Sequence, residues 1–268
     1  MLRSKLSVVC ACLMAISLGF STGCSVTPVD KTASMSPNAI YSEAQEEIGL
    51  GQWEKAIPLL EKLEARAAGT PLAQQAQIDK AYAHFKSGEP AQAIATLDRF
   101  MRLHPASPAL DYAMYLKGII NFNDDLGLLS GITRQDMSER DQKAAKESFE
   151  AFKELVARFP DSRYAPDARQ RMNYIVGSLA MYDVHVARYY FKRGAYLAAI
   201  NRAQSAVADF REVPAIEEAL FIIYKSYDAL GMVQLRDDAK RVLEKNFPHS
   251  DYLLKGGKPN TDPWWKLW

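Results

Sequence analysis

A seven-residue motif recurs along this chain and constrains its fold more than any other feature. It stands at Gly51–Ile57 (GQWEKAI), Gly88–Ile94 (GEPAQAI) and Gly194–Ile200 (GAYLAAI), and a weaker copy begins at Gly231. Each strong copy has Gly first, then Trp, Pro or Tyr two positions later, and ends in Ala-Ile. The first two glycines are 37 residues apart, and so are the last two. Self-similarity at this spacing is typical of repeat proteins built from helix pairs.

Each part of the repeat has a physical role. Glycine after a helix adopts the left-handed backbone conformation that other residues resist, and the small alanine five positions later lets two antiparallel helices approach closely. Proline then ends the second helix, in LHPASP (103–108), FPDSRYAP (159–166) and FPHSDY (247–252). This order of helix, glycine turn, helix and proline stop resembles the tetratricopeptide repeat (TPR). We therefore expect an all-α fold, an α-solenoid of about five TPR helix pairs.

Two departures from the regular repeat suggest how the chain is divided. Residues 121–141 interrupt the third repeat with a polar, glycine-containing sequence, so we expect a protruding surface loop there. Apolar residues at helical spacing from about Ala165 to Arg193 predict an unusually long helix. That helix would connect an N-terminal TPR lobe, residues 37–163, to a C-terminal TPR lobe, residues 164–254.

Residues 1–23 have the pattern of a signal peptide. A basic start precedes an uncharged run from Leu6 to Phe20, which is too short for a comfortable membrane span. The small residues that follow, with Cys24, resemble the lipobox of bacterial lipoproteins, although Ser21 replaces the usual aliphatic residue. The resemblance implies cleavage before Cys24 and lipidation of its thiol. Ordinary signal cleavage without lipidation is the alternative.

Cleavage at this point would also remove the two other cysteines, Cys10 and Cys12. The mature chain would then have no disulfide and no cysteine metal site, so packing must stabilise it. Residues 24–36 would form an acylated tether to the membrane, and Ser25 after the cysteine points to the outer membrane of a Gram-negative cell, on its periplasmic face. The formal net charge of +1 does not favour nucleic acid as a partner.

No pattern of catalytic residues stands out. The chain has no G-x-x-x-x-G-K-[ST] loop, no G-x-S-x-G elbow and no H-E-x-x-H pair. The four histidines are scattered, without a carboxylate or a second histidine at ligand spacing: His84, His104, His185 and His249. We therefore predict that the protein is not an enzyme and uses no metal and no other cofactor.

Binding is the function that remains. The first helices of stacked TPRs line a concave groove that suits an extended peptide or a partner helix. The candidate groove residues are Tyr82 and Phe85 on the second repeat, and Tyr112 and Tyr115 on the third. Several tyrosines together could bind apolar side chains and backbone carbonyls. Aromatic residues at helical spacing are more often core residues, so that alternative stays open.

Beyond the repeats, the chain resembles the BamD family, lipoproteins of the outer-membrane β-barrel assembly machine. The resemblance runs from Cys24 to about Phe247 and rests on DYAMYLKGI (111–119), DMSERD (136–141), FPDSRYAPDA (159–168) and VARYYFKRGAYLAAINR (186–202). It implies that the N-terminal repeats receive the C-terminal targeting segment of unfolded barrel proteins. It also implies that the C-terminal repeats dock the last POTRA domain of the barrel subunit BamA, and other Bam lipoproteins.

The same resemblance places residues at the docking surface. Arg202 matches the family's arginine there, and Tyr189, Tyr190, Arg193 and Asn201 belong to the narrowest part of the match. A guanidinium could bind a partner carboxylate through two parallel hydrogen bonds. Arg202 could instead be a solvated helix charge, and Arg193 could only cap its helix. The segment ARAAGTPL (65–72) departs from the family's substrate-contacting pattern, so we do not transfer that site residue by residue.

Residues 255–268, KGGKPNTDPWWKLW, form a Trp-rich tail after the last expected helix. Two glycines and two prolines in it favour a flexible connector. The tail could cap the solenoid, insert at the membrane interface, dock on a partner, or mimic a barrel targeting segment in the groove. The predicted function is a non-catalytic subunit of the barrel assembly complex. The alternative is a periplasmic TPR lipoprotein scaffold for peptidoglycan or division proteins.

Overall fold

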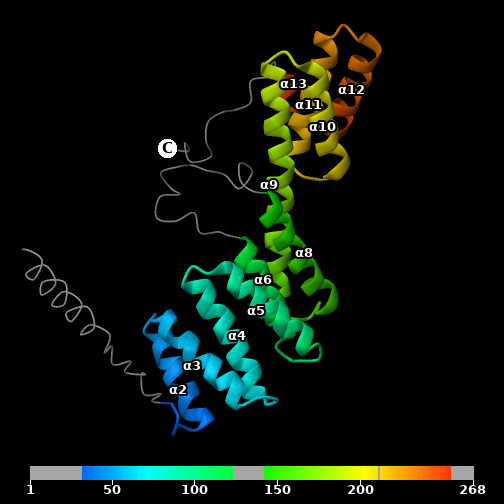
Figure 1. The fold of residues 1–268 in the computed structure, drawn as a ribbon. Helices are drawn as coiled ribbons and strands as arrows, with labels where there is room; N and C mark the ends of the chain where they lie inside the picture. Colours follow the sequence, from blue (N-terminus) through cyan, green and yellow to red (C-terminus); the bar gives the residue numbers. More distant parts are fainter. Residues whose placement is uncertain (1–31, 123–141, 211, 255–268) are drawn as a thin grey trace, which may run out of the picture.

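The computed structural model describes residues 32–122, 142–210 and 212–254. These residues form eleven helices and no strand, which confirms the all-α prediction. The helices follow one another as antiparallel pairs along an elongated solenoid (Figure 1). The predicted signal peptide, the lipidation of Cys24, most of the tether, nearly all of the predicted 121–141 loop and the tail lie outside the described residues.

Five helix pairs are present in the described part of the chain, followed by one short helix. Within each pair, the first helix precedes the second along the chain. The pairs are α2 (Pro37–Gly49) with α3 (Trp53–Arg66), α4 (Pro71–Lys86) with α5 (Pro90–Leu103), α6 (Leu110–Phe122) with α8 (Gln142–Arg158), α9 (Ala165–Lys192) with α10 (Tyr196–Asp209), and α11 (Ala215–Ala229) with α12 (Val233–Asn246), before α13 (Asp251–Leu254).

The glycine turns have the predicted geometry. Gly88 between α4 and α5 has a φ of 83°, and the other motif glycines also have positive φ. The alanine five positions later is fully buried in all three strong copies, at Ala56, Ala93 and Ala199. In the weaker fourth copy that position is Arg236, and Ala239 is the small buried residue instead. These small side chains are therefore buried in the core clusters, as close helix packing requires.

Proline-containing segments end the second helices as predicted. α5, α8 and α12 each end before a proline, at Leu103, Arg158 and Asn246. Side-chain caps begin some first helices: the Ser36 hydroxyl accepts the Ala39 N–H at 3.3 Å at the start of α2. The sequence therefore determines where these helices begin and end through local chemistry.

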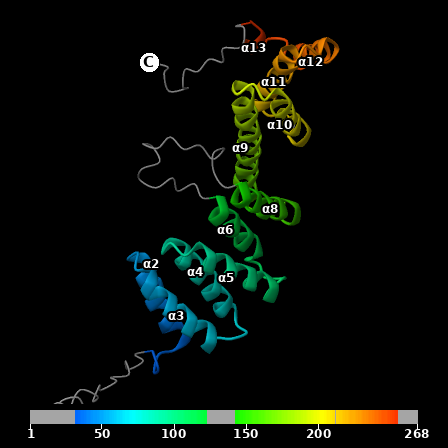
Figure 2. The ribbon, with the colours of Figure 1, turned by 45° about the horizontal axis from the view of Figure 1, so that its top comes forward.

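The long helix α9 joins the two ends of the solenoid. It runs without interruption between the α2–α8 group and the α10–α13 group (Figures 1 and 2). Its first half contributes Ile175 and Leu179 to the buried cluster of the middle helices. Its second half contributes Ala180 and Val184 to the cluster of the C-terminal helices. The division at residues 163 and 164 stays a prediction, because α9 belongs to both buried clusters.

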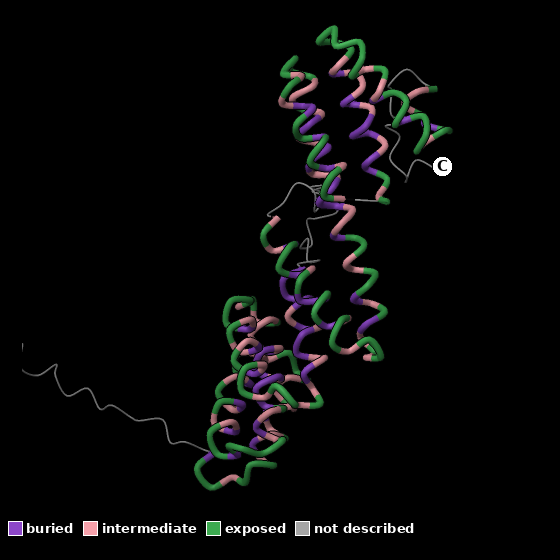
Figure 3. Tube along the Cα trace, turned by 90° about the vertical axis from the view of Figure 1, so that its right-hand side faces the viewer, coloured by how far each residue is buried: buried purple, intermediate pink, exposed green. Residues whose placement is uncertain are grey.

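Buried residues recur along the helices of both groups (Figure 3), and they form three clusters: one in the first helices, one in the middle helices and one in the C-terminal helices. Helices α6 and α8 approach closely, and the buried Ser148 hydroxyl donates to the Gly118 carbonyl at 2.8 Å. A Cβ atom on Gly118 would lie only 2.3 Å from Cε1 of Phe152, whose side chain is fully buried. Glycine at this position therefore allows α8 to pack directly against the backbone of α6.

Candidate binding surfaces

The four predicted groove residues are all half-buried and pack against the middle core cluster. The structure brings Tyr112 and Tyr115 together on α6, with Tyr164 before α9 as a shared neighbour. The ring centroids of Tyr115 and Tyr164 are 4.8 Å apart in a stacked arrangement, and those of Tyr112 and Tyr164 are 5.3 Å apart. Tyr82 on α4 contacts Trp53 on α3 instead, edge to face at 5.7 Å.

Hydrogen bonds fix one edge of this aromatic cluster. The Tyr115 hydroxyl donates to Asp167 at 2.7 Å, and the Arg171 Nε donates to the same carboxylate oxygen at 2.7 Å. Burial raises the pKa of Tyr115, and its bond to Asp167 raises it further. Burial alone would raise the pKa of Asp167, but its bonds from Arg171 and Tyr115 outweigh this and lower it. These side chains are therefore held in place before any ligand binds, and their role in a groove stays a prediction.

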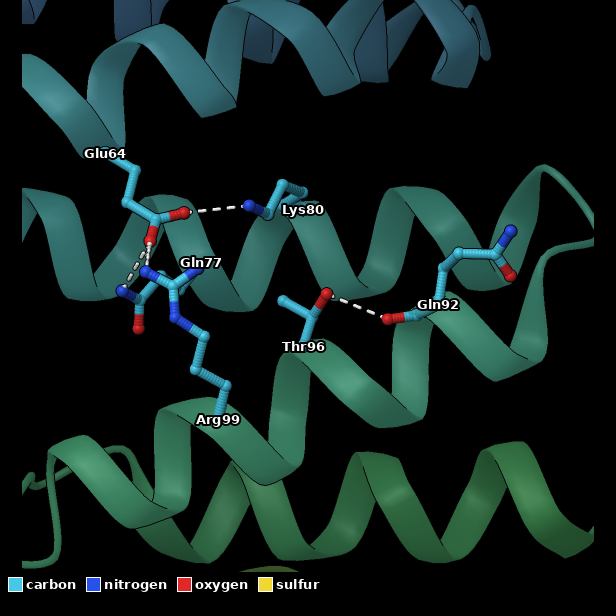
Figure 4. A network of polar contacts seen from close by, with 6 residues as sticks. All are labelled: Glu64, Gln77, Lys80, Gln92, Thr96 and Arg99. Atoms are coloured by element: carbon cyan, nitrogen blue, oxygen red, sulfur yellow. Dashed lines mark hydrogen bonds and ion pairs between the residues drawn. The ribbon is translucent and has the colours of Figure 1, made fainter.

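A part-buried polar network, which the sequence did not reveal, joins the first two repeats (Figure 4). Glu64 on α3 accepts bonds from Lys80 at 2.8 Å and Gln77 at 2.9 Å, both on α4. Arg99 on α5 donates to it at 2.8 Å. The Glu64 side chain is 13% exposed and that of Lys80 is 10% exposed. Burial would raise the pKa of Glu64, but the bonds and charges of its three partners together lower it.

This Glu64 network has both structural and surface consequences. It connects three helices, so it fixes how the second repeat sits on the first. A cleft of about 590 Å³ opens beside it, lined also by Gly69 and His104. Its members are 13, 16 and 35 residues from Glu64, so they could be found from sequence only by knowing which helices pack together.

A second polar interaction involves one of the scattered histidines. The Nδ1 atom of His84 lies 2.6 Å from a carboxylate oxygen of Glu89, a contact that the sequence analysis did not anticipate. The turn at Gly88 folds the chain back and brings the two side chains together.

Nowhere in the described chain do three His, Cys, Asp or Glu side chains gather so that they could hold a metal ion. No helix in residues 32–122, 142–210 and 212–254 has the length and apolar content needed to cross a membrane.

The predicted docking residues lie near the junction of α9 and α10. At the end of α9, the Arg193 guanidinium lies over the Tyr189 ring, with Cζ 5.2 Å from its centroid. The Tyr189 and Tyr190 rings are 5.8 Å apart, and Tyr189 is 55% exposed. Arg193 is also the C-cap residue of α9, as the capping alternative expected. Asn201 is exposed on α10.

Arg202 forms an ion pair within the chain. Its Nη1 lies 3.2 Å from Oδ1 of Asp183 on α9, while 47% of the Arg202 side chain stays exposed. Burial raises the pKa of Asp183, and the charge of Arg202 only partly offsets this. Asp183 and Tyr190 are two turns apart on one face of α9, about 10 Å along its axis. The ion pair therefore orients Arg202 on the same side as the tyrosine.

A known protein family covers nearly all of the residues described above. The model of the YfiO family, described as outer membrane lipoprotein, matches residues 33–252. The chain belongs to this family. The YfiO-family chain is 44% identical over 262 residues to the outer membrane protein assembly factor BamD of Neisseria meningitidis serogroup A / serotype 4A, covering 96% of this chain and 98% of that protein. It is 35% identical over 234 residues to BamD of Vibrio cholerae serotype O1, covering 87% and 96%. The resemblance to the BamD family is thus confirmed.

Solved structures are more distant from this YfiO-family chain. A Podosopora anserina kinesin light chain with TPR-like repeats is 16% identical, with a TM-score of 0.34 over 81% of this chain and 100% of that chain. The MamA protein is 17% identical, with a TM-score of 0.33 over 83% and 96%. The α-solenoid fold therefore rests on the helices of this chain alone.

Proposed function

We propose that this chain is a non-catalytic lipoprotein subunit of the outer-membrane β-barrel assembly complex. The observation that carries the proposal is its 44% identity, over 96% of its length, to a protein named outer membrane protein assembly factor BamD. A lipid on Cys24 would hold the solenoid at the periplasmic face of the outer membrane. Its two ends would bind different partners: the barrel subunit at the C-terminal repeats, and unfolded barrel proteins at the N-terminal repeats.

The α9–α10 junction is the proposed docking surface for a POTRA domain of a BamA-like barrel protein. About half of the Arg202 side chain is exposed, although one of its nitrogens contacts Asp183. The guanidinium is thus oriented in advance and still has edges that can donate to a partner carboxylate. Exposed Tyr189, near the C-terminal end of α9, adds an aromatic face at the same junction, which suits an interface. Other Bam lipoproteins would bind elsewhere on the C-terminal repeats.

The proposed substrate site is the aromatic cluster on α4 and α6. A nascent barrel strand has unpaired backbone groups and apolar side chains that favour aggregation. Tyr82, Phe85, Tyr112 and Tyr115 keep part of each side chain accessible while their remaining surface packs in the core. Such half-buried aromatics can bind without first being ordered. Anchoring this site to the barrel subunit would raise the effective concentration of the strand where it inserts.

The docking proposal is tested by capturing partners from detergent-solubilised outer membranes with tagged wild type and Arg202→Gln. The neutral variant avoids placing a second carboxylate beside Asp183. A charge-assisted hydrogen bond contributes about 1.5–3 kcal/mol, so capture of a POTRA-bearing barrel protein should fall about tenfold or more. The matched control is Arg158→Gln on α8, since Arg158 is 44% exposed and also pairs with one carboxylate, at 2.9 Å from Glu154.

Equal capture by Arg202→Gln and Arg158→Gln would contradict the docking surface. Recovery of wall-synthesis proteins without a barrel subunit would favour the alternative, a TPR lipoprotein scaffold for peptidoglycan or division proteins.

The substrate site is tested separately, by measuring binding of barrel C-terminal peptides and scrambled peptides to the purified protein. Tyr112→Ala should weaken the preference for barrel C-terminal peptides over scrambled peptides, whereas Tyr196→Ala on α10 should leave this preference unchanged. No preference in wild type would refute the substrate site.

A further inference from the structure

At the C-terminal end of the described residues, the sequence pattern of a sixth repeat begins, and the four-residue helix α13 is its described part. The segment FPHSDY (247–252) matches FPDSRY (159–164) in four of its six positions. FPDSRY directly precedes the 28-residue helix α9, whereas the last two residues of FPHSDY already belong to the four-residue helix α13. The sequence that follows Leu254 is KGGKPN, and its glycines and proline disfavour a helix.

Within the described residues, the last helix pair is partly uncovered. Elsewhere, the first helix of the next repeat packs on the second helix of the preceding pair, and α11 packs on both α9 and α10. In the described part of the chain, α13 is the element that packs on α11 beyond α12. A cleft of about 280 Å³ lies there, lined by α11, α12 and α13.

The lining of this cleft suits an aromatic side chain that carries a hydrogen-bond donor. Phe221 forms its aromatic surface, with ring centroids 5.3 Å from Tyr252 and 6.1 Å from Tyr224. Lys240 and Glu244 on α12 form the other wall, 3.5 Å apart, and both side chains are about half exposed. An indole can stack on the rings, place its face against the ammonium group, and donate its N–H to the carboxylate.

The position of the tryptophans in the sequence indicates the occupant. Three of the four tryptophans of the chain, Trp264, Trp265 and Trp268, follow α13 closely. Nine residues separate Leu254 from Trp264. Such a connector reaches up to about 30 Å. The cleft wall includes Tyr252 itself, so this reach is ample. A short flexible connector gives an effective concentration of about millimolar, far above that of a separate molecule in dilute solution.

We infer that residues 264–268 fold back into the cleft between α11, α12 and α13 of the same molecule. They take the place of the missing first helix of a sixth repeat and cover the end of the solenoid. Terminal repeats of solenoids need such a cover because no further repeat shields their inner face. The occupant is thus a segment of this chain, and a membrane surface or a second copy would compete with it.

The test uses the fluorescence of the tail tryptophans in the purified full chain. Trp53→Phe removes the one other tryptophan, so all indole emission then comes from residues 264–268. Iodide quenching should be several-fold weaker than for free N-acetyltryptophanamide, and emission should be blue-shifted. The extent of quenching and the emission wavelength should both be independent of protein concentration. Tyr224→Ala should restore strong quenching; Tyr227→Ala, on the same helix but outside the cleft lining, should not.

Lys240→Glu provides a second variant that leaves the core unchanged, because the Lys240 side chain is 46% exposed. It replaces the α12 ammonium group of the cleft wall by a carboxylate and should also increase quenching, although Lys225 on α11 still lines the cleft. Quenching as strong as that of the free compound in the Trp53→Phe protein would overturn the inference. Protection that disappears on dilution would place the tail in a second copy, and protection seen only with added lipid vesicles would place it in a membrane. Either result would overturn it too.

Discussion

Glycine at position 118 should be indispensable to the packing of α6 against α8, although it lies within a helix where alanine is normally preferred. Gly118→Ala would place a Cβ atom 2.3, 2.6 and 2.8 Å from three carbons of the Phe152 ring. Ordinary contacts begin at 3.4 Å, so the ring must move by about 1 Å. Phe152 is fully buried, with rings of Tyr115 and Phe122 centred 6.0 and 6.3 Å away, which leaves it little room.

Two opposing terms set the size of the effect. Overpacking in a core costs about 1–3 kcal/mol. Replacing glycine by alanine inside a helix gains about 0.5–1 kcal/mol. We therefore expect Gly118→Ala to lower the free energy of unfolding by about 1–2 kcal/mol, because the steric term exceeds the helix propensity gain.

Gly177 in α9 is the matched control, since a Cβ atom there would meet nothing within 4 Å. Gly177→Ala should raise the free energy of unfolding by about 0.5–1 kcal/mol, the helix propensity term alone. Urea unfolding followed by circular dichroism at the helix band measures both variants. Equal stabilisation by the two substitutions would refute the steric argument, as would a Gly118→Ala protein as stable as wild type.

Three further predictions concern side chains and turns described above. Glu64→Gln leaves Lys80 buried without its carboxylate and should lower the free energy of unfolding by about 2 kcal/mol at pH 7. The pKa of Glu64 is lowered by folding, so its contribution is present above the unfolded pKa and is lost as the pH falls through the folded pKa. The difference in the free energy of unfolding between wild type and Glu64→Gln should therefore become smaller as the pH falls from roughly 5 to 3. Urea titrations at each pH measure this difference, and a difference that grows on acidification would contradict the reasoning. Tyr115→Phe removes a donor to the half-exposed Asp167 and should cost about 1 kcal/mol without changing the helix content. Gly88→Ala forces alanine to a φ of 83° and should cost about 1 kcal/mol, measured by thermal unfolding; no loss would show that the turn can relax.

The repeat structure could be predicted from the sequence because its determinants are local. Glycine with positive φ, proline after a helix and a small alanine each act within a few residues of their position. The glycine turn at Gly88 and the buried Ala93 followed directly from one short motif. The family resemblance was equally accessible, because it depends on the order of residues along the chain.

The polar network at Glu64 could not be predicted in this way. Its three partners come from two other helices, and their side chains carry no signal until the helix packing is known. The ion pair of Arg202 shows the same limit: the sequence singled out the arginine, but not Asp183, which lies 19 residues away. Which part of Tyr115 is buried and which faces outward likewise depends on Tyr164 and Asp167, both contributed by the next repeat.

Because α9 contributes to both the middle and the C-terminal buried clusters, one continuous helix connects these two parts of the solenoid. A helix of 28 residues is about 42 Å long, so each half is about 20 Å long. A bend of about 10° at its middle would move either tip by about 3–4 Å, comparable to a residue step along a bound strand. Gly177 lies two residues before Leu179, where the middle cluster ends, and a Cβ atom there would meet nothing within 4 Å. Because glycine restricts the backbone least, we expect such a bend to occur at Gly177, and it would change the angle between the two groups of helices.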